Sequence, residues 1–452
     1  MKLKEILNYC NGTLIGDFDL NTEINKFSID SRNIDNNTFF IPLKGENVDG
    51  HEYINSAFEN GAIGTFTSKK LEKIEGKIII KVSDTLKALQ DLAKNFRIAN
   101  QNIPLVAITG SVGKTTTKDL IYSVLSSKYN TLKTAGNFNN EIGMPLTLIN
   151  YDNQDIIVLE MGMSSLGEIS FLSNTAKPNV GVITNVGHSH IGNLGSRENI
   201  LKAKMEIIDG MDEEGILVIN SDNDMLSTVK DIKQKIITFG FENKADVMAY
   251  NIKVNEDSTT FNIKENGEEY IVKLNLIGEK FIYNALAAWI IGMIYDVPVH
   301  NRIEALSKCE FTKMRMNIKN VNNMIVIDDC YNASPESMKL AMQALSKQEA
   351  KRKIAILGDM LELGEYSSKL HELVGENVAK YKIDKLFITG EFATSIKKGA
   401  IENGMKEENI SIFANTEEIE EKIIEYLEKE DAILIKASRG MKFEKIVKKI
   451  EN

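Results

Sequence analysis

Short apolar runs separated by longer amphipathic stretches dominate the chain from residue 105 onward. Each run is four or five residues long and rich in Val, Ile and Leu, which is typical of buried strands. They are 105–108, 156–159, 180–184, 216–219 and 236–239. The stretches between them have helical spacing. This alternation predicts a mostly parallel sheet with crossover helices.

A second alternating series begins at Met324, with apolar runs at 325–327, 354–357, 386–388 and 432–435. Between the two series lie a β-rich excursion at 247–277, whose turn is Asn266-Gly267, and an apolar helix at 281–295. The second series predicts a separate, Rossmann-like open α/β sheet.

The first hundred residues mix short strand-like runs with helical stretches and end in a polar linker, Asn100-Gln101-Asn102, before Pro104. A length of 452 residues fits about three domains. We therefore predict an α/β protein with a small N-terminal domain (1–102), a central domain (103–312) and a C-terminal domain (313–452).

Composition narrows the class of partner. The formal net charge is -10, which disfavours nucleic acid and acidic membrane surfaces. Cys10, Cys309 and Cys330 are far apart in sequence, as expected of buried thiols in a reducing cytoplasm. The longest apolar run, 285–295, is too short to span a bilayer. We expect a cytoplasmic protein without membrane insertion.

The strongest chemical signal follows the strand at 105–108. A Gly-rich turn leads into a helix that begins with Lys-Thr, the context of a phosphate-binding loop. The spacing is shortened to G-x-x-G-K-T, because Ile108 stands where the first glycine of the common pattern would be. The loop predicts ATP or GTP binding by Gly110, Ser111, Val112, Gly113, Lys114, Thr115 and Thr116.

Further polar residues follow neighbouring strands. Glu160 ends the strand at 156–159 and is either a second Mg²⁺ ligand beside Thr115 or a solvated carboxylate. Two of the five histidines, His188 and His190, fall in a Gly-flanked loop after the strand at 180–184. Their place favours a functional role over a structural one.

The helical pattern at 196–211 contains two lysines of interest. Lys202 has favourable spacing with Glu198 and is expected on the solvated face. Lys204 lies about 200° further around the helix, so it points the other way.

Together the shortened loop, Glu160, the histidine loop, Ala203-Lys204 and Asn284 resemble the Mur ligases, ATP-dependent amide-forming enzymes of peptidoglycan precursor synthesis. Residues 136–147, 327–335 and 357–364 are similar to members that add D-alanyl-D-alanine to UDP-N-acetylmuramoyl-tripeptide. Asp30-Ser31-Arg32 and Asp49-Gly50-His51 are similar to the UDP-binding domain of these enzymes.

The resemblance implies an acyl-phosphate mechanism and two Mg²⁺ ions, and we expect a monomer. Lys114, His190 and Lys204 would be catalytic, with Lys204 carbamoylated. Thr115 and Glu160 would hold one Mg²⁺, and His190 and Lys204 the other. ATP would also contact Asn284, Arg315 and Asp329. The substrate residues would be Ser31, Arg32, Asp49, Asn137, Asn139, Asn140, Asn332, Lys436, Ser438 and Arg439, where a helix cap is an equal alternative for the last three.

Alternatives remain within and outside the family. Many relatives have His-Leu-Glu where this chain has His190-Ile191-Gly192, so the carboxylate of those relatives is missing here. The tripeptide-forming ligase, which adds diaminopimelate or lysine, usually has His-Thr-Pro where Tyr331–Pro335 stands here. A folylpolyglutamate-type ligase would not explain the N-terminal domain. A nucleotide-operated switch without ligation would need only the phosphate loop.

Overall fold

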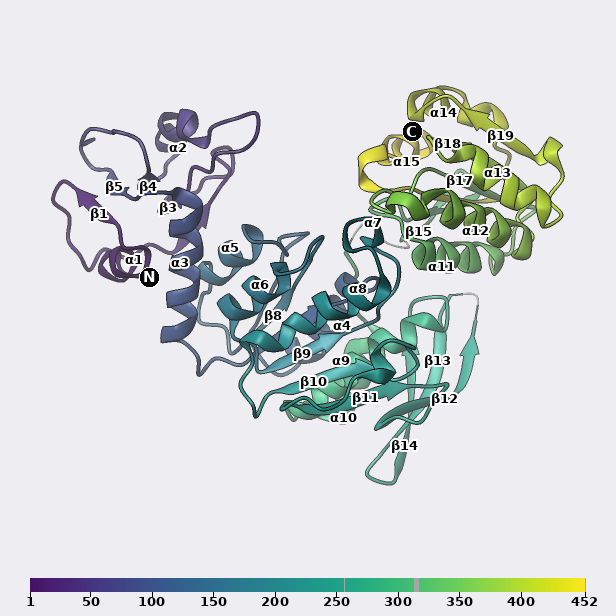
Figure 1. Ribbon diagram of the computed structural model, residues 1–452, viewed down its shortest axis with the longest axis horizontal. Coiled ribbons are helices and arrows are strands. Elements are labelled where there is room, and N and C mark those ends of the chain that lie inside the picture. The colour runs from purple at the N-terminus through teal and green to yellow at the C-terminus, as the bar shows by residue number, and fades with distance from the viewer. Residues whose placement is uncertain (256, 313–316, 452) are drawn as a thin grey trace.

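The computed structural model describes residues 1–255, 257–312 and 317–451, and it contains three sheets in sequence order along the chain. In Figure 1 the N-terminal sheet (purple) and the C-terminal sheet (green to yellow) lie at opposite ends of a central region (teal). The predicted α/β class with three sheet-containing regions is confirmed.

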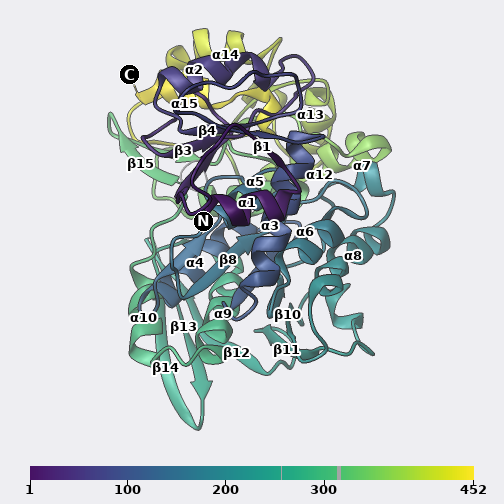
Figure 2. The ribbon, with the colours of Figure 1, turned by 90° about the vertical axis from the view of Figure 1, so that its left-hand side faces the viewer.

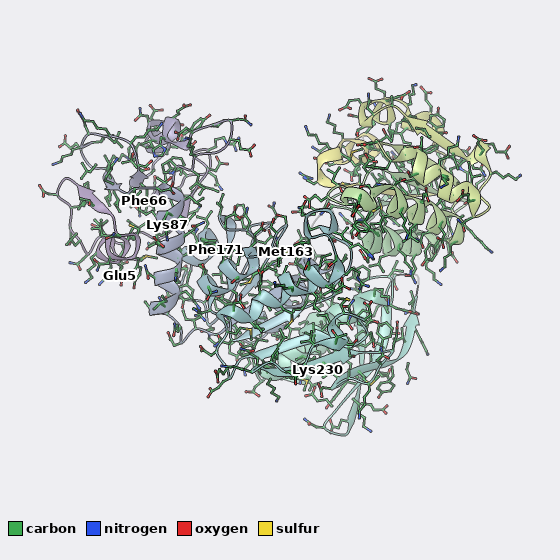
Figure 3. The ribbon with its side chains drawn as sticks, viewed as in Figure 1. Glu5, Phe66, Lys87, Met163, Phe171 and Lys230 are labelled. Atoms are coloured by element: carbon green, nitrogen blue, oxygen red, sulfur yellow. The ribbon has the colours of Figure 1, made fainter. Side chains whose placement is uncertain are left out.

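The N-terminal sheet has the order β1-β5-β4-β3-β2, with only the β1–β5 pair antiparallel. Its strands are β1 (Thr13–Ile15), β2 (Lys26–Ser28), β3 (Thr38–Phe40), β4 (Gly64–Thr67) and β5 (Ile78–Lys81). Its helices are α1 (Leu3–Cys10), η1 (Gly50–Tyr53), α2 (Ile54–Glu59) and α3 (Thr85–Ala99). Phe66 packs edge-on against Phe39 in its core, and Figure 3 shows where Phe66 lies.

The central sheet has the order β14-β13-β12-β11-β10-β9-β6-β8-β7 and is parallel from β7 to β12. Its strands are β6 (Leu105–Thr109), β7 (Thr131–Lys133), β8 (Ile156–Glu160), β9 (Val180–Ile183), β10 (Ile216–Asn220), β11 (Lys235–Gly240), β12 (Val247–Val254), β13 (Thr259–Glu265) and β14 (Glu268–Leu274). The predicted hairpin at Asn266-Gly267 joins β13 to β14.

Successive residues of β6 point to opposite faces of the central sheet, as the period of a strand requires. Val106 and Ile108 join the apolar core with α4 (Lys114–Ser126) and α9 (Lys280–Ile294). Leu105 and Ala107 join the core on the other face. The remaining helices of this region are α5 (Gly143–Ile149), α6 (Glu168–Ala176), α7 (Ile191–Leu194), α8 (Arg197–Met205), α10 (Val299–Ser307), η2 (Glu206–Gly210) and η3 (Leu226–Thr228).

The C-terminal sheet has the order β15-β16-β20-β17-β18-β19 and is parallel except for the β15–β16 hairpin. Its strands are β15 (Asn317–Val321), β16 (Met324–Asp328), β17 (Arg352–Leu357), β18 (Lys385–Thr389), β19 (Ile410–Phe413) and β20 (Asp431–Lys436). Its helices are α11 (Pro335–Ser346), α12 (Ser367–Lys380), α13 (Ala393–Glu402), α14 (Thr416–Lys422), α15 (Glu444–Glu451), η4 (Gly364–Tyr366), η5 (Glu407–Asn409), η6 (Ile423–Tyr426) and η7 (Arg439–Met441).

The edge strand β15 was not predicted from the hydrophobic pattern. Its residues are partly polar, and only a tight turn with positive φ at Asn322 and Asn323 folds it onto β16.

Helix α3 joins the N-terminal and central regions. It packs against α5 and α6, and Figure 2 shows it from the N-terminal side. The Arg97 guanidinium donates to the carbonyls of Ala176 and Lys177 at 2.7 and 3.1 Å. Because α3 shares its packing with the central helices, the domain limit after residue 102 stays a prediction, as does the limit after residue 312. No helix of the described ranges is long and apolar enough to cross a membrane.

Candidate active site

The phosphate-type loop joins β6 to α4, and its two glycines are required by close contacts. A Cβ at Gly110 would lie 1.9 Å from Thr184 Oγ1, and one at Gly113 would lie 2.7 Å from Asn284 Nδ2. Gly113 also has a φ of +88° as the N-cap of α4, a conformation that side chains with a Cβ avoid. Only glycine therefore fits at both positions.

The loop that follows β9 holds the phosphate-type loop from one side. Thr184 Oγ1 and Asn185 Nδ2 each donate to Val112 O at 2.7 Å, and Asn185 Oδ1 accepts from Val112 N. The Gly187 amide donates to Ser111 Oγ at 2.9 Å. These bonds fix the shape of the loop.

The first turn of α4 brings together the residues predicted to act on phosphate and metal. Thr115 Oγ1 donates to Glu160 Oε2 at 2.9 Å, and Asn139 Nδ2 donates to Glu160 Oε1 at 2.8 Å. Lys114 Nζ contacts Gly110 O at 2.7 Å. A buried carboxylate beside a hydroxyl at the helix N-terminus is an oxygen donor set that suits Mg²⁺ with phosphate. The two sequence-predicted ligands are thus adjacent.

Lys204 lies on α8 with only 1 % of its surface exposed, whereas Lys202 is exposed. Burial, and next the charge of Lys114, hold the pKa of Lys204 well below its ordinary value near 10.5. A lysine with a lowered pKa is neutral more often, and a neutral amine is what carbamoylation needs. The predicted opposite orientation of the two lysines is confirmed.

The histidine loop reaches the C-terminal region. His188 Nδ1 lies 2.6 Å from Glu336 Oε1, and His190 Nδ1 pairs with Glu362. The Gly192 amide donates to Glu362 O at 3.1 Å. A ring nitrogen held by a carboxylate leaves the other nitrogen for a ligand, as in many metal sites. In the part of the chain that the structure describes, no three His, Cys, Asp or Glu side chains gather as a metal cluster. The predicted ligand set, which draws on Thr115 and Lys204, is of a different kind.

A cavity of about 990 Å³, including its open mouth, separates the central and C-terminal regions. Its central wall contains the phosphate-type loop and Asn284, which also donates to Thr117 Oγ1 at 2.8 Å. Its C-terminal wall contains Asp329, Asn332 and Lys436. The structure thus brings together Asn284 and Asp329, the predicted nucleotide contacts. Arg315 lies outside the described residues.

The C-terminal wall is organised by a buried cation. Lys436 Nζ donates to Asp329 Oδ2 at 2.6 Å and to Asn332 O at 2.8 Å, and the lysine is 1 % exposed. Ser438 Oγ accepts from the Leu361 amide at 2.9 Å, and Arg439 forms an ion pair with Glu444. Lys436 and Ser438 therefore form hydrogen bonds within the C-terminal region. These bonds do not test the predicted contact of either residue with substrate.

The predicted substrate residues of the N-terminal region are away from this cavity and make local contacts. Arg32, whose side chain is 88 % exposed, pairs with Asp30. That pairing lowers the pKa of Asp30 to about 2. Asp49 accepts from the His51 amide and forms an ion pair with Lys69, and these bonds lower its pKa. The Ser31 carbonyl accepts from Asn60 Nδ2 at 2.8 Å.

The asparagines of the 136–147 stretch differ in their surroundings. Asn139 donates to Glu160, as described above. Glu160 ends β8, and Figure 3 labels Met163, which follows that strand. Asn140 Oδ1 accepts from the amides of Ile142 and Gly143 before α5. Asn137 is exposed.

Sequence reasoning missed the apolar part of the cavity and the carboxylates that hold the histidine loop. The large apolar side chains of this lining are Leu276, Phe281, Phe311 and Leu340. These residues come from separate segments, and each alone looks like an ordinary core residue. Glu336 and Glu362 are likewise distant in sequence from the histidines that they contact.

Comparisons with known proteins agree over the whole chain. Family descriptions match at 23–97 (Mur ligase family, catalytic domain), 108–292 (Mur ligase middle domain) and 314–439 (Mur ligase, glutamate ligase domain). The UDP-N-acetylmuramoyl-tripeptide--D-alanyl-D-alanine ligase of Bacillus subtilis (strain 168) is 38% identical over 450 residues, 99% of this chain and 97% of that protein. The enzyme of that name from Escherichia coli (strain K12) is 31% identical, covering 99% of this chain and 98% of that one.

Solved structures show the same likeness. MurF from Acinetobacter baumannii superimposes with a TM-score of 0.89 at 28% identity, over 100% of this chain and 98% of that chain. MurF ligase from Thermotoga maritima, solved in complex with ADP, has a TM-score of 0.80 at 30% identity, over 95% and 97%. With the phosphate-type loop, the buried lysine of α8 and the shared cavity in place, these matches are decisive: the chain belongs to the Mur ligase family.

Proposed function

We propose that the protein joins D-alanyl-D-alanine to UDP-N-acetylmuramoyl-tripeptide at the expense of ATP, the activity for which its full-length relatives are named. The observation that carries this proposal is the cavity that brings the phosphate-type loop and Asn284 opposite Asp329 and Lys436. A nucleotide that fills such a cavity would hold two regions together around the reacting groups.

The reaction has two steps. The terminal carboxylate oxygen of the tripeptide attacks the γ-phosphorus of ATP, and ADP leaves. The amine of D-alanyl-D-alanine then attacks the acyl carbon, loses a proton, and expels inorganic phosphate as the amide forms. Charge accumulates on phosphate oxygens in the first step, so catalysis relies on fixed positive groups. Lys114 and the amides of the phosphate-type loop supply them.

Mg²⁺, when bound by Thr115 and Glu160, would neutralise phosphate charge. His190 and a carbamoylated Lys204 are the proposed holders of a second ion near the tripeptide carboxylate. The low pKa of Lys204 supports carbamoylation. Electron density for the lysine in a nucleotide-bound crystal tests it, and an unmodified ammonium group there would contradict it.

We assign the UDP part of the substrate to residues 1–102, ATP to 103–312 and the incoming dipeptide to 313–452. Ser31, Arg32 and Asp49 would contact the UDP-substrate. Asn137, Asn139 and Asn140 would lie toward its peptide, and Asn332, Lys436, Ser438 and Arg439 toward the amine and the reacting carboxylate. A cytoplasmic monomer is the expected state.

Phosphate release with one substrate omitted at a time tests the activity. Release should require ATP, UDP-N-acetylmuramoyl-tripeptide and D-alanyl-D-alanine together. Slow release from ATP alone, unchanged by the other two, would indicate a nucleotide switch instead. Turnover of the UDP-linked dipeptide with diaminopimelate or lysine would indicate the tripeptide-forming ligase.

A further inference from the structure

A series of polar contacts connects the two walls of the nucleotide cavity. The reaction steps proposed above assign no role to His188 or Glu336. The series starts at Ser111, whose Oγ accepts from the Gly187 amide at 2.9 Å and whose carbonyl accepts from Ser189 Oγ at 3.3 Å. Between these two anchors stands His188. The position of His188 is therefore set by the hydrogen bonds that its two neighbours make to Ser111 of the phosphate-type loop.

His188 makes two contacts with one carboxylate oxygen of the C-terminal region. Its backbone N–H donates to Glu336 Oε1 at 3.0 Å, and its ring Nδ1 lies 2.6 Å from that oxygen. The Glu336 carboxylate also lies against the Gly187 backbone, since a Cβ on Gly187 would lie 2.6 Å from the same oxygen. The carboxylate is thus in contact with both the ring and the backbone of this loop.

Glu336 lies in the first turn of α11, directly after cavity-lining residues. The preceding Ala333 and Ser334 line the cavity, and Ser334 is the N-cap of the helix. A carboxylate in the first turn suits the positive end of the helix dipole. Glu336 and this part of the C-terminal wall therefore belong to one helix N-terminus.

The electrostatics of the pair favour a positioning role over a stabilising one. Burial alone would raise the pKa of Glu336, but the hydrogen bond from the His188 ring, the backbone N–H bonds and the His188 charge together outweigh it, and the pKa is lowered. Glu336 Oε2 is nevertheless buried without a hydrogen-bond partner among the described residues, as is Arg197 Nε on the central side. The side chains of His188 and Glu336 are each 33 % exposed, and a partly exposed ion pair contributes little net stability.

We propose that His188 and Glu336 are positioning residues that hold the C-terminal wall of the nucleotide cavity at a set distance from the phosphate-type loop. They would thereby raise the affinity for adenine nucleotide. The inference rests on the proposed function only in taking ATP and ADP as the ligands. Neither residue is among those proposed to act on the reacting groups.

Calorimetric titration of the full chain with Mg²⁺ and ADP tests the pair. His188→Ala and Glu336→Ala should each weaken binding about tenfold, and the double variant should be no weaker than either single variant. Glu336→Gln keeps an oxygen that can accept both bonds, so it should bind within about threefold of the wild type. Affinities within twofold of wild type for the alanine variants, additive losses in the double variant, or a loss for Gln as large as for Ala would each overturn the proposal.

Tyr366→Phe is the matched control. It removes another hydrogen bond between the two regions, from Tyr366 Oη to Gly195 O at 3.0 Å, but that bond has no link to Ser111. It should leave ADP affinity unchanged, and a loss equal to that of Glu336→Ala would overturn the specific role of the pair.

A second readout separates positioning from damage to the fold. Melting temperatures without nucleotide, and the affinity for UDP-N-acetylmuramoyl-tripeptide, should match the wild type in all variants. If wild-type enzyme fails to ligate the dipeptide while the variants still lose ADP affinity as stated, the proposed function falls and this inference stands.

Discussion

The two walls of the nucleotide cavity are built by different means. The central wall is a backbone loop, shaped by two glycines and tied by neutral side chains of the next strand's loop. The C-terminal wall is shaped by one buried cation, Lys436, which joins Asp329 and Asn332. Backbone amides can bind an anion such as phosphate, whereas a buried ion pair can hold a loop in one position.

The difference predicts which wall carries chemistry and which carries stability. Removing a group from the central wall should impair phosphate transfer without unfolding the protein. Removing Lys436 should leave a buried carboxylate without its closest cation, which is costly to the fold.

The largest expected effect is on the central wall. Lys114→Ala should lower the rate of phosphate release on the order of 10³-fold, because a fixed charge on the transferring phosphoryl group is lost. Binding of UDP-N-acetylmuramoyl-tripeptide, measured by calorimetry, should persist. Loss of both phosphate release and binding of the UDP-substrate would show that the assignment of ligands to separate regions is wrong.

On the C-terminal wall, Lys436→Met should lower the free energy of unfolding by about 3–5 kcal/mol, because Asp329 stays buried. Thermal unfolding monitored by circular dichroism measures this change. Adding Asp329→Asn should recover part of the loss. An unchanged melting temperature with abolished turnover would instead favour the substrate contact predicted from the sequence.

A smaller effect is expected for Gly113→Ala. The new methyl group would collide with Asn284, and the left-handed backbone costs about 1–2 kcal/mol. We expect roughly tenfold weaker ADP binding. Gly167→Ala is a matched control, since Gly167 is also a helix N-cap, at φ +89°, with nothing within 4 Å of the added Cβ. Equal loss of ADP affinity in both variants would refute the steric explanation.

The smallest effect concerns pH and the C-terminal region. Burial lowers the pKa of His371 below its ordinary value of 6.5, and His371 Nε2 accepts from the Met360 amide. As the pH falls below about 6.5, the unfolded chain takes up a proton that the folded state binds less readily, so stability is lost. His371→Gln should remove this part of the slope, measured by urea unfolding from about pH 8 to about pH 5. An identical slope in the variant would exclude His371 as its source.

Much of the central wall could be predicted because its signals are local. Gly110, Gly113, Lys114 and Thr115 lie within six residues, directly after an apolar strand, and the opposite orientation of Lys202 and Lys204 follows from helix geometry. The C-terminal wall could not be predicted from pattern alone. Asp329 and Lys436 are 107 residues apart, and each is an ordinary charged residue at the end of a strand.

By itself the sequence determined the three α/β regions, the phosphate-type loop and the family, because periodicity, glycine spacing and motif order are properties of neighbouring residues. Only the tertiary structure decided that Glu160 meets Thr115, that Lys204 is buried near the charge of Lys114, and that His188 grips Glu336. These contacts join strands and helices whose proximity depends on sheet order and on packing between regions. The burial of a side chain and its hydrogen-bonding or ionic partners set its chemistry, and both exist only once the chain has folded.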